Sequence, residues 1–403
     1  LFRAVTIEDL EASITDGYPM PWLAEILEDE TIPWEDRYWL DCRMRSIFAQ
    51  DLHLFFGTNG TPTLVEADYI HPGEDYWREY LLVNPVRQTD VDEELRPTMA
   101  YGEPGYIFDR YGRKIGELAD VHPFTALSRD ASIATVVSGG TTMESRREGF
   151  ACFMYPDGSF TEVSLQESGD FSVVAGGNGD VVAFQCLLPL SMHDPVTYER
   201  TGAAGDVYFF DRNGNLLKRV SPPVIFSADE RGKLSSNERY FCDALCTGEL
   251  FLVDLKSDFQ DNLIAMSEGG RGRFSFNFSP DGNFLCIGGF SRGLVMNLET
   301  SDTIWISNTE FVGINDNVKL HCSNDAEWIT ETMIRGSYPN RYHELRVYNK
   351  NYLIYSDTAE SRYWEETILS PSGHFLLTQN DHVIISDTGI PTVIRQIRRE
   401  GSE

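Results

Sequence analysis

The sequence predicts an all-β fold assembled from repeated four-stranded antiparallel sheets. Two short hairpin patterns alternate along most of the chain, and each contains the turn residues that antiparallel strands need. The composition supports a large core, since 41% of the 403 residues are hydrophobic and 12% are aromatic. No run of about 18 apolar residues occurs, so no segment is expected to cross a membrane as a helix.

The first pattern is a run of alternating apolar residues, then Asp or Asn, a turn, and a second strand. LVMNLETSDTIWIS (294–307) is the clearest copy. Copies recur about every 45 residues, the period of a four-stranded repeat. Their anchor residues are Asp109, Tyr155, Asp211, Asp254, Asn297, Asn349 and Asp387.

The second pattern is a hairpin that begins with Ser, as in SPDGNFLC (279–286). Each copy lies between two copies of the first pattern, so every period contains two hairpins and therefore four strands. The other copies are SRDASIAT (128–135), SSNERYFC (235–242), SNDAEWIT (323–330) and SPSGHFLL (370–377), with GGNGDVVA (176–183) as a weaker one.

A lone four-stranded sheet cannot bury both faces, whereas radial packing of several sheets buries both and leaves only short edges. The sequence therefore predicts a β-propeller with seven blades. SPDGNFL followed by a strand and an Asp or Asn turn resembles the WD-repeat and the TolB-like or YVTN-like bacterial propeller families, over residues 75–396. The chain lacks their Trp-Asp pair, and the resemblance implies a fold rather than a function.

The regions before and after residues 75–396 have other patterns. Residues 1–52 read as a helical N-terminal segment, from helices expected at 6–17, 20–30 and 32–51, and we interpret it as a cap with Trp22, Trp34 and Trp39 largely buried. A docking element for a separate partner is the alternative. Residues 53–74 read as an appended hairpin and linker, because 70–104 looks irregular, and 397–403 as a tail. If 53–69 instead belongs to a further repeat, the propeller has eight blades.

The net charge of −30 disfavours nucleic acid and anionic membranes as partners. A solubilising surface explains such acidity, and halophilic adaptation or cation binding would also do so. The seven cysteines are odd in number and scattered, which argues against a disulfide framework. No nucleophile motif, phosphate loop or close histidine pair is present, so we expect no catalytic residue, no cofactor and no metal.

The long loops suggest where a partner binds. With the strands of a blade named A to D in chain order, the A–B and C–D turns are short, whereas three B–C loops are long, at 138–149, 188–205 and 333–344. Loops longer than a turn requires often have a function. They contain Arg and Tyr, residues that are enriched at interfaces. The candidate partner-binding residues are Arg146, Arg147, His193, Tyr198, Arg200, Arg335, Tyr338, Arg341, Tyr342 and His343.

Two functions fit this pattern. The first is a non-catalytic scaffold that binds a protein, peptide or glycan through the B–C loops, with an acidic partner favoured by the arginines. The second is a propeller enzyme, lactonase-like or glycan-cleaving, with a site at the central channel. An enzyme needs acids on the innermost strands, and segments such as SFNFS (275–279) are mostly apolar or hydroxylic, which favours the scaffold. Export after leader removal is weakly favoured over the cytoplasm, and the oligomeric state stays open.

Overall fold

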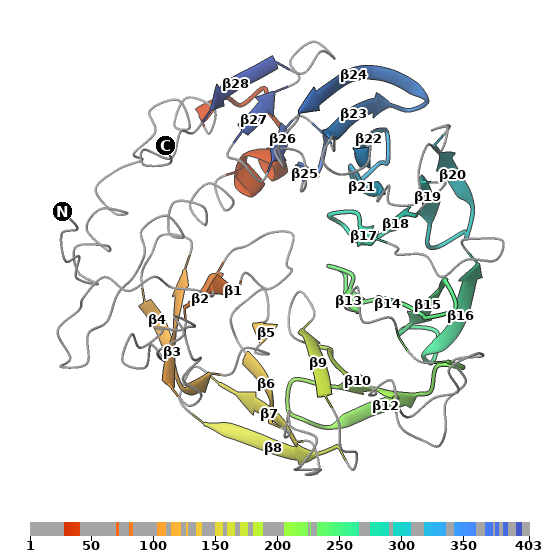
Figure 1. Cartoon of the computed structure of the whole chain (residues 1–403). Coiled ribbons are helices and arrows are strands. Elements are labelled where there is room, and N and C mark those ends of the chain that lie inside the picture. The colour runs from red at the N-terminus through yellow and green to blue at the C-terminus, as the bar shows by residue number, and fades with distance from the viewer. Residues whose placement is uncertain are drawn as a thin grey trace, which may run out of the picture. The chain divides into compact units, whose positions relative to one another are not determined.

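The structure is a computed structural model, and strands dominate the residues that it describes. These residues are 28–40, 70–71, 80–83, 103–109, 114–121, 126–127, 134–138, 150–155, 159–165, 170–175, 180–187, 205–224, 226, 232–265, 275–289, 293–307, 318–335, 342–359, 367–373, 375–378, 382–385 and 392–396. The chain forms two compact units (Figure 1). Unit 1 comprises Leu1–Asp29 and Asp41–Ile225, and unit 2 comprises Glu30–Leu40 and Phe226–Glu403.

Unit 1 contains three four-stranded antiparallel sheets in which neighbouring strands follow one another along the chain. The first consists of β1 (Ile70–His71), β2 (Tyr80–Val83), β3 (Glu103–Asp109) and β4 (Lys114–Val121). The second consists of β5 (Ala126–Leu127), β6 (Ala134–Ser138), β7 (Phe150–Met154) and β8 (Phe160–Ser164). The third consists of β9 (Asp170–Ala175), β10 (Val182–Leu187), β11 (Val207–Phe210) and β12 (Leu216–Val220).

Unit 2 contains four sheets of the same topology. The first two consist of β13 (Lys233–Leu234), β14 (Tyr240–Ala244), β15 (Glu249–Asp254) and β16 (Gln260–Ala265), and of β17 (Ser275–Phe278), β18 (Phe284–Gly288), β19 (Gly293–Asn297) and β20 (Thr303–Ile306). The other two consist of β21 (Val318–Cys322), β22 (Trp328–Arg335), β23 (Tyr342–Asn349) and β24 (Tyr352–Ala359), and of β25 (Thr367–Leu369), β26 (Phe375–Thr378), β27 (His382–Ile385) and β28 (Thr392–Gln396).

Both predicted hairpin patterns are confirmed. The Ser hairpins join the first and second strands of their sheets, and the Asp or Asn hairpins join the third and fourth. One expectation was wrong, since residues 70–104 are not simply irregular: β1 and β2 lie there and pair with β3 in one sheet. Like the weaker copy at 176–183, these two strands lack the Ser turn that marks the other five first hairpins. The hairpin expected at 53–69 lies outside the described residues.

Where the structure describes their side chains, neighbouring sheets within each unit pack face to face through apolar cores, as propeller blades do. In unit 1, Phe153, Phe184 and Phe210 meet edge to face between two sheets, with ring centroids 5.6–5.7 Å apart. In unit 2, three clusters fill the successive interfaces from β13–β16 to β25–β28. The thiols of Cys242, Cys286 and Cys322 are free and buried in these clusters, where they pack as small apolar groups.

The Ser hairpins of unit 2 share one turn geometry. The hydroxyl of Ser279 accepts a hydrogen bond from the N–H of Phe284 at 3.0 Å, and the carbonyl of Ser279 accepts one from the N–H of Gly282 at 2.9 Å. Gly282 has φ of 75°, and Glu238 and Ala326 have φ of 54° at the matching positions. The same bonds form at three further turns, which begin at Ser235, Ser323 and Ser370.

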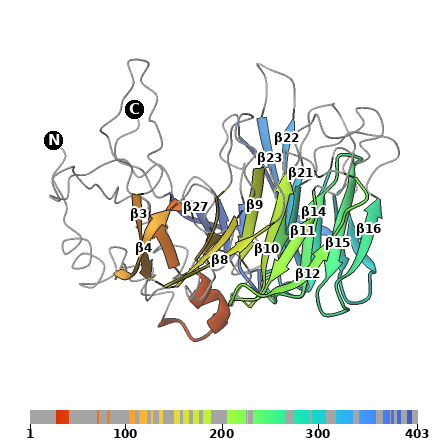
Figure 2. The same cartoon turned by 90° about the horizontal axis from the view of Figure 1, so that it is seen from below.

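Neighbouring turns are also bonded to one another. The hydroxyl of Ser236 donates to the carbonyl of Pro280 at 2.5 Å, and the N–H of Asn324 donates to the carbonyl of Pro371 at 2.7 Å. At the last turn, Ser372 donates from its N–H at 2.9 Å and from its hydroxyl to the carboxylate of Asp36. Asp36 belongs to a short helix at residues 34–40, so this helix adds one more contact to the series of turns (Figure 2).

The helical N-terminal segment is confirmed at residues 34–40, and residues 1–27 and 41–52 lie outside the described part of the chain. Trp39 is fully buried as expected, but the expectation for Trp34 was wrong, because its side chain is 64% exposed. The helix buries the side that carries Asp36, Trp39 and Leu40, which leaves Trp34 on the opposite side. Trp22 lies outside the described residues.

We predict that Gly288→Ala destabilises the fold strongly. A Cβ added at Gly288 would overlap the carbonyl oxygen of Val318, where β18 approaches β21 of the next sheet. Because backbone on both sides must move, the free energy of unfolding should fall by about 3 kcal/mol or more, measured by urea denaturation. The matched control is Ala244→Gly at the equivalent position of β14, with an expected cost of about 1 kcal/mol. Similar losses for the two variants would contradict the argument.

Candidate functional site

The end of the β22–β23 hairpin is the part of the predicted loop face that the structure describes. Arg335 is the last residue of β22 and pairs in register with Tyr342, the first residue of β23. Tyr342 is 38% exposed, and the neighbouring His343 is buried. Each strand has eight residues, and Figure 2 shows both reaching beyond the neighbouring strands of unit 2. Three of the ten candidate residues thus lie together at one projecting hairpin end.

The other seven candidate residues lie outside the described residues. They are Arg146, Arg147, His193, Tyr198, Arg200, Tyr338 and Arg341. Whether the three long loops share one surface therefore stays a prediction.

A polar row runs along β23 below this end. Alternate residues of a strand face the same side, so Tyr342, Glu344, Arg346 and Tyr348 share one face. Tyr348 packs into the cluster shared with β17–β20, and its ring lies 5.2 Å from that of Trp305. The polar row therefore faces the β17–β20 sheet, while Leu345 and Val347 on the other face pack toward β25–β28.

The row surrounds a fully buried carboxylate, Glu331 of β22. Ser307, just after β20, donates its hydroxyl hydrogen bond to Glu331, and the hydroxyl of Tyr348 donates to the second oxygen at 3.0 Å. Arg346 Nη1 lies 3.9 Å from Glu331, while its Nε donates to Glu344 at 2.7 Å. The guanidinium of Arg346 thus lies close to the carboxylates of both Glu331 and Glu344. The hydroxyls of Ser307 and Tyr348 donate the remaining hydrogen bonds to the buried Glu331.

The electrostatics follow from this arrangement. Burial, followed by the charge of Glu331, raises the pKa of Tyr348 to about 12. Burial opposes the charge of Arg346, but hydrogen bonding and charge interactions with Glu344 and Tyr348 together outweigh burial and raise the pKa of Arg346. Both groups therefore keep their protons at neutral pH. The described cluster has no exposed acid that could exchange protons with a substrate. We interpret it as a support for the hairpin end below Tyr342.

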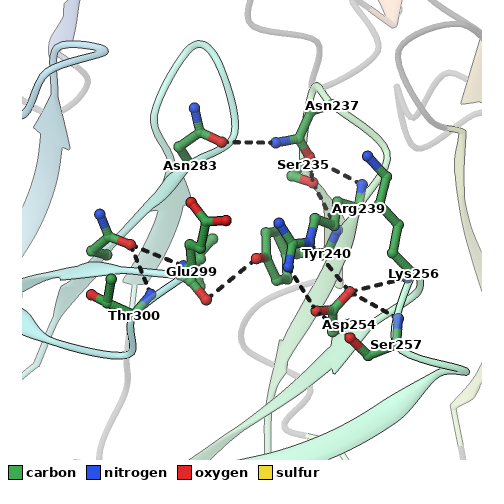
Figure 3. A network of polar contacts seen from close by, with 12 residues as sticks. Ser235, Asn237, Arg239, Tyr240, Asp254, Lys256, Ser257, Asn283, Glu299 and Thr300 are labelled. Carbon is green, nitrogen blue, oxygen red and sulfur yellow. Dashed lines mark hydrogen bonds and ion pairs between the residues drawn. The ribbon is translucent and has the colours of Figure 1, made fainter.

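A second polar network joins the β13–β16 and β17–β20 sheets at the turns (Figure 3). Arg239 binds Asp254 in a two-pronged ion pair at 3.2 and 3.4 Å, and Asp254 also accepts hydrogen bonds from Lys256 and Ser257. Burial would raise the pKa of Asp254, but these bonds outweigh burial and hold the pKa below its usual value. Arg239 and Asp254 neutralise each other within the network, so we interpret it as a structural connection between the two sheets.

The same network contains two bonds between the sheets. The hydroxyl of Tyr240 donates to the carbonyl of Leu298 at 3.3 Å, and Asn237 donates to the side chain of Asn283 at 3.3 Å (Figure 3). The ring of Tyr240 also lies under Arg239, whose guanidinium carbon is 4.8 Å from the ring centroid. Asn237 and Tyr240 come from the Ser hairpin and Leu298 from the Asn hairpin of the next sheet.

The first strands of the unit 2 sheets lie at the inner ends of the sheets (Figure 1). Sequence reasoning expected apolar or hydroxylic residues there and missed the basic residues Lys233, Lys319 and His321. Lys233 donates to the carbonyl of Phe276 at 3.1 Å and to Asn277 at 2.9 Å. The signal was available for Lys233 and His321, because each is followed by one apolar or thiol residue and then by the Ser of the turn. No carboxylate occurs on β13, β17, β21 or β25.

Two further searches concern only the described residues. They contain no group of three or more His, Cys, Asp or Glu side chains placed to hold a metal ion. They also contain no helix that is long and apolar enough to cross a bilayer.

Comparison with solved structures returns β-propellers at low sequence identity. One match is the β-propeller domain of Cps50 (Swd1) from Myceliophteria thermophila, at 12% identity and a TM-score of 0.40, covering 69% of this chain and 86% of that one. Another comes from a structure of the mitotic checkpoint complex, at 14% identity and a TM-score of 0.43, covering 74% of this chain and 80% of that one. No protein-family model and no curated protein matches the sequence.

We predict that Arg346→Met costs much more stability than Arg239→Met. Without Arg346, the fully buried Glu331 keeps only neutral donors, and an uncompensated buried charge costs about 3 kcal/mol. Asp254 is partly exposed and retains the donors of Lys256 and Ser257 without Arg239, so that loss should be about 1 kcal/mol. Urea denaturation of the two variants measures both values. Equal losses would show that Glu331 does not depend on Arg346.

Proposed function

We propose that this chain is a non-catalytic scaffold that binds a protein, peptide or glycan partner through its B–C loop face. The observation that supports this proposal is the projecting β22–β23 end, where an exposed Tyr342 pairs in register with Arg335. Tyr and Arg dominate binding hot spots, because each combines a large contact area with hydrogen-bond donors.

The underlying cluster supports the same proposal. A recognition residue binds more tightly when it is already held in place, because less conformational freedom is lost on binding. Ser307 and Tyr348 hold Glu331, and Arg346 connects it to Glu344, two residues from Tyr342. The polar groups of this row bond to one another. Such an arrangement is better suited to supporting a binding surface than to acid–base catalysis.

Charge favours an acidic or carboxylate-bearing partner at this face. The predicted loops contain Arg146, Arg147, Arg200, Arg335 and Arg341 in a chain of net charge −30. A local positive potential on this acidic chain would attract an acidic partner. The same potential would repel another copy of the chain less strongly than the acidic surfaces would.

The test reverses charge and removes the aromatic anchor. We expect Arg200→Glu/Arg335→Glu to abolish capture of partners from the native source, and Tyr342→Ala to weaken binding of a captured partner at least tenfold, since a hot-spot anchor contributes about 2 kcal/mol or more. The melting temperature of each variant should stay within about 2 °C of the parent, which separates a loss of binding from a loss of folding.

The matched control for Tyr342 is Tyr352→Ala. Tyr352 is 74% exposed and lies in the same sheet, at the opposite end from Tyr342. It should leave capture unchanged. If the double charge reversal captures the same partners as the parent, or if Tyr352→Ala weakens binding as much as Tyr342→Ala, the loop face is not the binding surface.

We further infer that the sheets form seven blades. Seven four-stranded sheets occur among the described residues, and an eighth blade would need residues 53–69. Electron-microscopy projections along the propeller axis count blades directly. A seven-lobed ring is expected, and eight lobes would reject the inference.

A further inference from the structure

The helix at residues 34–40 has two faces with different roles. Its inner face is anchored to unit 2, because Asp36, Trp39 and Leu40 are fully buried and Asp36 accepts both bonds from Ser372. Trp34 and Tyr38 are one turn apart and therefore lie on the opposite face, with ring centroids 6.4 Å apart. The anchored inner face holds this aromatic pair in a fixed position.

The exposure of Trp34 calls for an explanation. At 64% exposed, it leaves a large apolar ring in water in the same seven-residue helix that fully buries Trp39. A tryptophan exposed beside a second aromatic ring is a common anchor for a binding partner. Packing against the described residues does not cover the side of the helix that carries Trp34.

The surroundings of the aromatic pair are acidic. Glu30 is exposed and Glu35 is partly exposed next to Trp34, with the partly buried Arg37 as the cation of this segment. Through Ser372, the helix joins the face formed by the hairpin turns of unit 2. The described turns there contain eight carboxylates and three cations, counted from Glu238, Asp254, Asp258, Asp281, Glu299, Asp302, Asp325 and Glu327 against Arg239, Lys256 and Lys350.

Eight carboxylates against three cations give these described turns a net charge of −5. Among those turn residues, Arg239 pairs with Asp254 and Lys350 with Glu327. Asp325, in the turn beside Ser370–Phe375, belongs to the remaining acids, and the N–H of Asn324 links these two turns directly. The acidic hairpin turns of unit 2 therefore extend to the turn on which the helix is anchored.

We propose that Trp34 and Tyr38, with the acidic turns of unit 2, form a second binding surface for an arginine- or lysine-containing segment of a partner protein. The indole face attracts a cation through its quadrupole, and carboxylates around it attract the same charge. Another copy of this chain or an anionic membrane would meet like charge instead. The loop face and this surface thus favour partners of opposite charge, and each proposal can fail without the other.

The test uses the full chain and defined peptides. The probe is a 12-residue Gly/Ser peptide with four arginines, compared with the same peptide carrying citrulline, the neutral isostere of arginine, by fluorescence anisotropy at about 150 mM salt, where exposed charges are screened beyond about 8 Å. We expect measurable binding of the arginine peptide and at least tenfold weaker binding of the citrulline peptide. Trp34→Ala should weaken arginine-peptide binding about threefold to fivefold, as loss of one exposed cation–π contact predicts.

Two matched controls separate this site from the general acidity of the chain. Phe160→Ala removes an aromatic ring of similar exposure, 68%, in unit 1, and should leave peptide affinity unchanged. Glu30→Gln/Glu35→Gln should weaken binding more than Glu162→Gln/Asp261→Asn, which changes the net charge equally at exposed sites on β8 and β16. Unchanged melting temperatures would exclude unfolding as the cause.

Three results would overturn the proposal. If Trp34→Ala binds the arginine peptide as the parent does, basic segments use another acidic surface. If the citrulline peptide binds equally well, the surface does not select for a cation. If sedimentation shows a dimer that Trp34→Ala dissociates, the occupant is a second copy of the chain.

Discussion

The buried serine hydroxyl at the start of each first hairpin is the interaction on which the described part of unit 2 depends. It accepts the N–H of the aromatic residue five positions later and so closes a turn whose fourth residue has positive φ. A closed turn fixes the register of the second strand, and that strand is buried on both faces. The residue after the serine then bonds to the next turn, or receives a bond from the turn before it. The packing between these sheets therefore depends on a hydrogen bond within a single turn.

Strand β22 shows how much polarity such an interface tolerates. Thr330 occupies the position of Cys242 and Cys286 in the preceding sheets, and its buried hydroxyl has no hydrogen-bond partner. A thiol is a weak donor and tolerates an apolar site better than a hydroxyl does. On the other face of the strand, Glu331 is equally buried but is bonded by Ser307 and Tyr348. The contrast indicates that hydrogen bonds within the polar row compensate for the burial of Glu331. Burial of the Thr330 hydroxyl without a partner instead destabilises the strand locally.

The distribution of charge gives the two ends of unit 2 different chemistry. The described turns carry eight carboxylates against three cations, while the β22–β23 end presents Tyr342 beside Arg335. Net acidity alone keeps a protein soluble and says little about partners. In the two proposals above, the acidic aromatic surface and the arginine-bearing loop face favour partners of opposite charge. A scaffold that joins two proteins of opposite charge would use this arrangement.

Local pattern in the sequence was sufficient for the hairpins and their pairing into four-stranded sheets, because the Ser, Asp and Asn turns and the alternation of apolar residues involve neighbours only a few positions apart. The end formed by Arg335 and Tyr342 was placed only in part, because residues 333–344 read as one loop, whereas 333–335 belong to β22 and 342–344 to β23. Tertiary structure alone decided that Trp34 is exposed while Trp39 is buried, since helical periodicity leaves several faces open and only the contact of Asp36 with Ser372 selects one. It also decided the cluster of Ser307, Glu331 and Arg346, whose members come from two sheets and meet only when those sheets pack face to face.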